Sequence, residues 1–263
     1  MTKSIGHWVC RHHRNTVIRY IAKKCRSFLG YYENVNWNFD SNGELYVLNR
    51  LASLDFRCIL DVGANHGAWA LAANRIWPVA QIHAFEIVPA TVATLLEKTR
   101  ETPTIIANDF GLYETEQEIE VIHHPDKDTT SAIAINHRET AGLKLTCRVV
   151  TGDSYVTKCN IVRIDFLKLD VEGAEDKVLK GFVETIRQER IAIIQFEYSR
   201  RNILSHFLLY DFYRFFEEHN FSVGKIYPNY VDFRRYNPWN ENFYLSNFLA
   251  VHNEQKRVFD LLS

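Results

Sequence analysis

The chain of 263 residues lacks several features that would place it in a specialised class of protein. It has no run of about 18 apolar residues, so no transmembrane helix is expected. Its five cysteines are an odd number without a Cys-x-x-Cys pair, which indicates neither a disulfide framework nor a zinc site. No fixed sequence period recurs, which excludes collagen-like and repeat architectures. An export signal is also missing, and with reduced thiols this favours the cytoplasm.

What is present is typical of a globular protein. Apolar residues make up 46% of the chain and charged residues 24%, and the aromatic share of 13% excludes disorder for most of the chain. The length fits one large domain better than two small ones.

Charge is distributed unevenly, although the net charge is only −1. Residues 1–30 contain no acid and seven basic residues, which are Lys3, Arg11, Arg14, Arg19, Lys23, Lys24 and Arg26. A basic segment could contact an anionic membrane surface or nucleic acid. The favoured interpretation is an amphipathic helix that packs on the body through Trp8, Val9, Ile18 and Ile21. Nucleic acid is not expected as a partner, because the rest of the chain is acidic.

The centre of the chain alternates strand-like and helix-like segments. Strands are expected at residues 57–62, 79–85, 103–107, 118–122, 143–150, 161–169, 191–196, 221–227 and 243–251, the last two as a closing antiparallel pair. Helices are expected at residues 67–77, 89–100, 175–187 and 208–219. This alternation predicts an α/β fold with a Rossmann-like, doubly wound sheet. Residues 1–56 are expected to form a partly helical cap on that domain.

Four acidic residues follow or end the apolar runs: Asp61, Glu86, Asp170 and Glu197. Ligands bind at the carboxyl ends of the strands in an open α/β sheet, so these side chains mark the expected site.

The first motif is the glycine-rich turn Asp61-Val-Gly-Ala-Asn-His-Gly67 between a strand and a helix. Gly63 permits a tight turn, and Gly67 permits close approach of the backbone. No lysine follows Gly67, which excludes a P-loop, and Asn65 stands where a dinucleotide fingerprint requires glycine. S-adenosylmethionine has no phosphate and fits such a turn.

Two further positions are candidates for the same cofactor. Glu86 ends the second strand, where a carboxylate accepts hydrogen bonds from ribose hydroxyls. Asn108 or Asp109, after the third strand, could hold the adenine amino group, and a simple Asn-Asp turn explains the pair equally well.

The second motif is Leu167-Lys-Leu-Asp-Val-Glu-Gly-Ala-Glu175. Lys168 and Asp170 point to the same side of a strand, and a lysine inside an apolar run needs a partner or a water-filled site. Asp170 and Glu172 would place negative charge near a sulfonium cation. A salt-bridged strand end followed by a capped helix explains the motif as well.

Together these motifs resemble the FkbM family of S-adenosylmethionine-dependent methyltransferases, over roughly residues 57–251. The similarity lies in Leu60-Asp-Val-Gly-Ala-Asn-His-Gly67, in His83-Ala-Phe-Glu86 and most specifically in the second motif. The resemblance implies a mostly parallel, seven-stranded methyltransferase sheet in a domain of residues 57–263. It also implies O-methylation of a hydroxyl, often on a sugar, glycan or natural product. Gly152 and a long 123–142 loop depart from the family pattern and leave the acceptor open.

By the same resemblance, the cofactor residues would be Asp61, Gly63, Asn65, Gly67 and Glu86, and Asp170, Glu172 and Glu197 would lie near the reacting methyl group. A weakly nucleophilic hydroxyl benefits from a general base. Glu197 or Asp170 is favoured for this role over Glu172 and His206, because burial beside another carboxylate raises a pKa. No required metal is expected, and His123, His124 and Asp126 are most simply part of a turn.

The acceptor wall is expected in the aromatic stretch 227–248, together with Arg234, Arg235 and the 123–142 loop, because aromatic faces stack on sugar rings. An exposed aromatic surface could equally be an oligomer contact. Two other functions stay open, an NAD(P)-dependent oxidoreductase and a non-catalytic binding module on the same fold.

Overall fold

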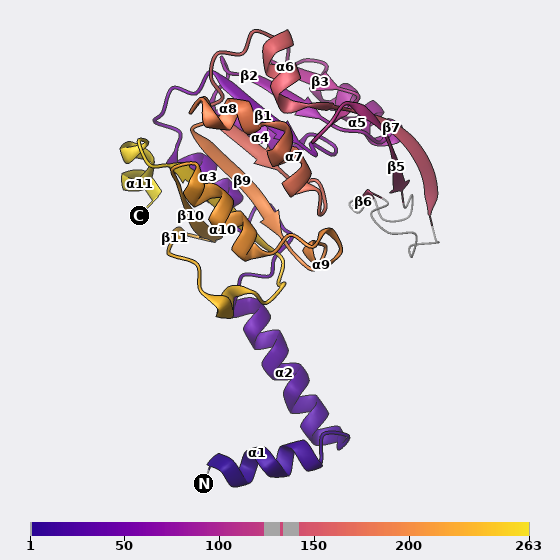
Figure 1. The fold of residues 1–263 in the computed structure, drawn as a ribbon, viewed down its shortest axis with the longest axis vertical. Helices are drawn as coiled ribbons and strands as arrows, with labels where there is room; N and C mark the ends of the chain where they lie inside the picture. Colours follow the sequence, from indigo (N-terminus) through magenta and orange to yellow (C-terminus); the bar gives the residue numbers. More distant parts are fainter. Residues whose placement is uncertain (1, 124–131, 134–141, 263) are drawn as a thin grey trace.

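The structure is a computed structural model that describes residues 2–123, 132–133 and 142–262 (Figure 1). Its centre is a sheet with the strand order β3-β2-β1-β8-β9-β12-β10-β11. The strands are β1 (Cys58–Val62), β2 (Gln81–Phe85), β3 (Ile105–Asn108), β8 (Phe166–Leu169), β9 (Ile193–Tyr198), β10 (Phe221–Tyr227), β11 (Tyr230–Phe233) and β12 (Ser246–His252).

The sheet confirms the expected doubly wound topology. Strands β3, β2, β1, β8 and β9 are parallel neighbours, and β12 runs antiparallel between β9 and β10. The chain moves outward from β1 to β3 and then returns to the other side of β1 at β8, so the topological switch lies between β1 and β8. The sheet has eight strands, not seven, because β11 forms a hairpin with β10 at the edge.

Each face of the sheet has its own apolar core, because successive side chains of a strand point to opposite faces. In β1, Leu60 and Val62 belong to one core and Ile59 belongs to the other. The core that contains Leu60 is covered by α6 (Gly152–Lys158), α7 (Glu175–Gly181), α8 (Val183–Arg187) and α10 (Leu209–Glu218). The core that contains Ile59 is covered by α3 (Glu44–Arg50), α4 (Ala68–Ile76), α5 (Pro89–Thr99) and α11 (Lys256–Leu262).

The helix expected over residues 175–187 is broken into α7 and α8 at Phe182. The Phe182 ring is fully buried and packs directly on Gly152, where an added Cβ would lie 2.5 Å from the ring. Gly152 therefore allows α6 to approach the α7–α8 junction closely. The body also contains a short helix, α9 (Asn202–Ser205), and a 3₁₀ turn (Pro238–Asn240).

A second, smaller sheet has the order β4-β7-β5-β6. Its strands are β4 (Gly111–Tyr113), β5 (Gln117–His123), β6 (Ala132–Ile133) and β7 (Leu143–Thr151). The expected strands at residues 118–122 and 143–150 are confirmed as the antiparallel pair β5 and β7. Most of the 123–142 loop, including His124 and Asp126, lies outside the described residues.

Two helices, α1 (Thr2–Arg11) and α2 (Thr16–Tyr32), extend away from the body (Figure 1). The expected packing of this segment on the body is wrong for Trp8, Val9 and Ile21, which are exposed. Just after α2, Glu33 forms an ion pair of 2.5 Å with Lys225 of β10, which anchors the base of the helix. Among the described helices, none combines the length and the apolar character needed to cross a membrane.

Candidate functional site

A cavity of about 1020 Å³ opens at the carboxyl ends of β1, β2 and β8, at the topological switch. Its inner wall contains Gly63, Glu86, Asp170 and Glu197, which are predicted site residues. The smaller sheet contributes Gly111, Leu112, Ile119 and Val149 to the wall, and the chain from α2 to α3 contributes Lys23, Arg26, Tyr31, Trp37 and Glu44. The volume is at the upper end of the range for small-molecule sites.

The glycine turn between β1 and α4 gives the cavity its floor. Gly63 has φ +83°, and a Cβ there would lie 1.9 Å from the backbone oxygen of Asp170. Only glycine fits this contact between the two central strands. Asn65 has φ +48°, and its side-chain oxygen is buried without a hydrogen-bond partner.

Gly67 lies at the start of α4, beside α5. Its φ is +79°, and a Cβ would lie 2.7 Å from Leu95 of α5. Gly67 does not line the cavity, and its lack of a side chain lets α4 pack against α5.

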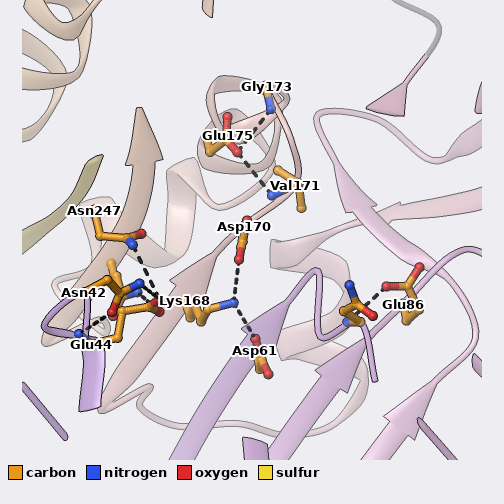
Figure 2. Close-up of polar contacts among 12 residues, drawn as sticks. Asn42, Glu44, Asp61, Glu86, Lys168, Asp170, Val171, Gly173, Glu175 and Asn247 are labelled. Atoms are coloured by element: carbon orange, nitrogen blue, oxygen red, sulfur yellow. Dashed lines mark hydrogen bonds and ion pairs between the residues drawn. The ribbon is translucent and has the colours of Figure 1, made fainter. Parts of the chain in front are cut away.

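The Glu86 carboxylate accepts hydrogen bonds from backbone amides of two turns, and Figure 2 shows its contact with the glycine turn. Its Oε2 accepts a hydrogen bond from the Asn65 amide at 3.1 Å, and its Oε1 accepts from the amides of Ile87 at 2.8 Å and Val88 at 2.9 Å. Burial raises the pKa of Glu86, while these amide hydrogen bonds oppose the rise. A carboxylate has about four acceptor sites, so Glu86 retains capacity for a ligand hydroxyl.

A row of polar side chains crosses three neighbouring strands on the α3–α4 face of the sheet. The strand register places Asp61 beside Lys168 and Lys168 beside Gln195. Lys168 Nζ lies 3.4 Å from Asp61 and 3.1 Å from Asp170 (Figure 2). Gln195 donates a hydrogen bond of 2.6 Å to Glu44 of α3. Lys168 thus has the partners that its position in an apolar run requires.

Burial and neighbouring charges act in opposite directions on the pKa values of this row. Burial lowers the pKa of Lys168, but the nearby charges of Asp170, Asp61 and Glu44 outweigh burial and raise it overall. Burial raises the pKa of both Asp61 and Glu44, and Lys168 opposes the rise. Asp61 is fully buried, and its second carboxylate oxygen has no hydrogen-bond partner.

The loop between β8 and α7 presents two more carboxylates. Glu172 has φ +57° and forms an ion pair of 2.6 Å with Arg201. Burial raises the pKa of Glu172 to about 7, against the opposing charge of Arg201. Glu175 accepts hydrogen bonds from the amides of Val171 and Gly173, and burial raises its pKa to about 8.

Glu197 lies on β9 and lines the same cavity. Burial raises its pKa well above the usual value, and the negative charges of Asp170, Glu172, Glu175 and Glu44 raise it further. A raised pKa makes the carboxylate form of Glu197 a stronger proton acceptor than an ordinary glutamate, which suits a general base.

Other predicted residues lie outside the cavity wall. Asn108 is engaged by Ala84, Ile106 and Tyr155, and Asp109 is exposed, so their cofactor role stays a prediction without support from this geometry. His206 is exposed at the end of α9. His123 ends β5, and within residues 2–123, 132–133 and 142–262 no group of three or more His, Cys, Asp or Glu could hold a metal ion.

Of the eight aromatic residues predicted as the acceptor wall, two line the cavity, Phe243 and Tyr244. Phe248 lies in the core, and Tyr236 packs against that core. Trp239 is exposed in the 3₁₀ turn, and Arg234 forms an ion pair with Asp232.

Sequence reasoning missed Glu44, Arg201 and the α2 residues of the wall. Glu44 follows Gly43, the residue that caps α3, which has φ +105° and lies against the backbone of Tyr227. Because this contact joins segments far apart in the chain, it leaves no pattern in the sequence around Glu44. Arg201 lies shortly after Glu197, at the predicted end of a strand. An arginine so close to an acidic strand end could have indicated an ion pair at the site.

Two curated proteins share part of this sequence. Hexuronic acid methyltransferase AglP of Haloferax volcanii is 29% identical over 138 residues, which are 51% of this chain and 54% of that protein. Methyltransferase 1 of Beauveria bassiana is 28% identical over 143 residues, 47% of this chain and 57% of that protein. The matched region thus spans about half the length of each relative.

Among solved structures, methyltransferase FkbM of Methylobacillus flagellatus KT aligns with a TM-score of 0.48 and 14% identity, over 74% of this chain and 44% of that chain. Residues 61–223 match the methyltransferase FkbM domain, from the glycine turn to β10. The matched range contains Gly63, Glu86, Asp170 and Glu197, and it covers more than half of the chain. The chain belongs to the methyltransferase FkbM domain family.

Proposed function

We propose that the protein transfers a methyl group from S-adenosylmethionine to a hydroxyl oxygen of a sugar or glycan. The observation that carries this proposal is the joint placement of the glycine turn, Glu86, Asp170 and Glu197 around one cavity. Membership of a methyltransferase family supports the reaction class. A relative that acts on hexuronic acid supports a sugar as the acceptor.

The residues of the cavity fit S-adenosylmethionine. The turn that contains Gly63 and Asn65 has no room for a side chain at Gly63. The buried side-chain oxygen of Asn65 has no hydrogen-bond partner and can accept a bond from the ligand. Glu86 would hold the ribose hydroxyls. Asp170 and Glu172 would face the positive charges of the cofactor. Four carboxylates, Glu86, Asp170, Glu172 and Glu197, line this end of the cavity beside two cations, Arg200 and Arg201, and this balance favours a cationic ligand.

When bound, S-adenosylmethionine supplies a methyl group on a positively charged sulfur. Glu197 would accept the proton that the acceptor hydroxyl loses when its oxygen is methylated. Burial raises the pKa of Glu197, and the charges of Asp170 and Glu172 raise it further, which would stabilise the proton once Glu197 has accepted it. The walls of the cavity align the reactants, which is the main contribution an enzyme makes to a displacement of this kind.

Thermal unfolding of the full chain with excess S-adenosylmethionine, S-adenosylhomocysteine, NAD or NADP tests the cofactor. At about 100 times its dissociation constant a ligand adds about 2.7 kcal/mol, which raises the melting temperature by about 5 to 10 °C. A rise with the two adenosyl compounds alone is expected, and it should disappear in Glu86→Ala but persist in the exposed control Glu116→Ala. A rise with NAD or NADP would replace this proposal with the oxidoreductase.

Turnover tests the acceptor and the base. Incorporation of labelled methyl into glucuronic acid, with glucose as the uncharged comparison, probes the sugar class named by the relative. Glu197→Gln should still bind S-adenosylhomocysteine and should lose turnover by about 100-fold or more. Equal turnover in this variant would remove Glu197 from the chemistry. If both the wild type and Glu197→Gln bind S-adenosylhomocysteine but neither transfers methyl, the result would favour a non-catalytic binding module.

A further inference from the structure

The N-terminal arm, defined here as residues 2–32, carries charge of one sign. All seven basic residues of positions 1–30 lie in it, and the first acid of the chain is Glu33. The arm consists of α1 and α2, which extend from the body (Figure 1). A segment with this charge that leaves the acidic body is suited to an anionic surface.

Both helices of the arm expose apolar side chains along one stripe. On α1, Ile5, Trp8 and Val9 are exposed and follow the i, i+3, i+4 spacing of one helix face. On α2, the exposed fractions are 64% for Val17 and 68% for Phe28. Large apolar side chains that stay in water on two successive helices indicate a surface that a partner covers.

The two faces of α2 have different surroundings. Lys23, Ser27, Gly30 and Tyr31 recur at helical spacing and line the cavity. At 100° per residue, Val17, Ile21, Phe28 and Tyr32 fall within about 60° of one another, on a side of the helix that faces away from Lys23 and Gly30 and borders Tyr31, and all four are exposed. The apolar stripe therefore belongs to neither the cavity nor the core.

We propose that the arm lies on an anionic lipid bilayer, with the apolar stripes of α1 and α2 in the interface and the basic residues that do not line the cavity at the headgroups. Aromatic and aliphatic side chains on one face and Lys/Arg on the polar face are the features of an interfacial helix. The α2 helix of 17 residues is about 25 Å long and can lie in the surface plane. A second copy of the arm fits the stripe less well, because it would bring two sets of seven cations together without acids.

Co-sedimentation of the full chain with vesicles tests this proposal. One set contains phosphatidylcholine alone, and the other contains phosphatidylcholine and phosphatidylglycerol in equal amounts. The chain should sediment with the mixed vesicles, and added salt should release most of it because surface potentials are screened. The indole fluorescence of Trp8, compared with the Trp8→Leu variant, should shift to shorter wavelength on binding, since an exposed indole enters the interface.

Two variants separate charge from apolar burial, and both avoid residues that line the cavity. Arg19→Gln with Lys24→Gln should lower partition into mixed vesicles about 30-fold. Ile21→Ser with Phe28→Ser should lower it at least about 10-fold, because two apolar side chains no longer enter the interface. The matched control is Val162→Ser with Trp239→Ser, which removes exposed apolar side chains from the body and should change nothing.

Several results would overturn the proposal. Equal sedimentation with both kinds of vesicle, or equal partition of all variants, would exclude an electrostatic and apolar contact through the arm. A dimer by light scattering that Ile21→Ser with Phe28→Ser converts to monomer, without vesicle binding, would assign the stripe to a second copy. Binding to a DNA duplex but not to mixed vesicles would assign the charges to nucleic acid. None of these results bears on cofactor binding.

Discussion

Replacing Lys168 by methionine should destabilise the protein severely while conserving side-chain volume. Lys168 Nζ is the cation between Asp61 and Asp170, at 3.4 and 3.1 Å. Asp170 is 38% exposed and regains water when the cation is removed. Asp61 is fully buried, so its charge would stay uncompensated. Removing one partner of a buried ion pair costs about 3–5 kcal/mol, which corresponds to a melting temperature lower by about 10 °C.

A second variant shows whether the lost stability comes from the charge of Asp61. Lys168→Met combined with Asp61→Asn removes both charges of the pair and leaves neutral side chains of similar size. The double variant should therefore recover about 2 kcal/mol or more relative to Lys168→Met alone. Urea denaturation of the three variants and the wild type gives the coupling free energy between the two positions.

The pH dependence gives an independent check. Without Lys168, the pKa of Asp61 rises further above its unfolded value, so the folded state binds the extra proton. A raised folded pKa means that stability is retained at low pH and lost as pH rises through that pKa. The cost of Lys168→Met should thus be smaller at pH 5 than at pH 8. A loss below about 1 kcal/mol, or a double variant no more stable than Lys168→Met, would refute the buried-charge reasoning.

The remaining predictions concern the glycine turn and the two acids with raised pKa. Gly63→Ala should cost at least about 2 kcal/mol by urea denaturation and abolish binding of S-adenosylhomocysteine, whereas Gly6→Ala, with open space around it, should not destabilise the protein. Glu172→Gln should move the acid limb of the pH–rate profile to lower pH, since it removes a negative charge that raises the pKa of Glu197; an unmoved limb would contradict this coupling. Glu175→Gln should be more stable than the wild type above pH 8, because the wild-type carboxyl, with a pKa of about 8, must lose its proton there while buried; equal denaturation curves at pH 9 would speak against it.

The sequence allowed the central sheet to be predicted because its strands are short apolar runs bounded by turn residues. The strand predicted over residues 161–169 is too long, since β8 begins at Phe166. Helix α6 and strand β4 were missed. Thr151 caps α6 through the Ser154 amide, which is a local signal, whereas β4 pairs with β7 and depends on a contact across the chain.

The candidate site was predictable where it depends on local motifs. The need of Lys168 for a partner followed from its position in an apolar strand, and the structure supplies Asp61 and Asp170. Glu44 was not predictable, because it reaches the site through the packing of α3 on the sheet. The pattern of α2 was correct as an amphipathic helix, but periodicity does not tell whether the apolar face meets the body or solvent.

The buried carboxylates of the cavity link ligand binding to protons. Burial raises the pKa of both Glu172 and Glu197 and nearby carboxylates raise both further, while Arg201 opposes the rise at Glu172. A cation that enters this cavity lowers both pKa values, so protons leave the protein as the cation arrives. Calorimetry in buffers of different ionisation enthalpy measures the number of protons released on binding. That number should be larger for S-adenosylmethionine, which is a sulfonium, than for S-adenosylhomocysteine, which is a neutral thioether. The number of protons bound by these carboxylates would then depend on the charge of the ligand in the cavity.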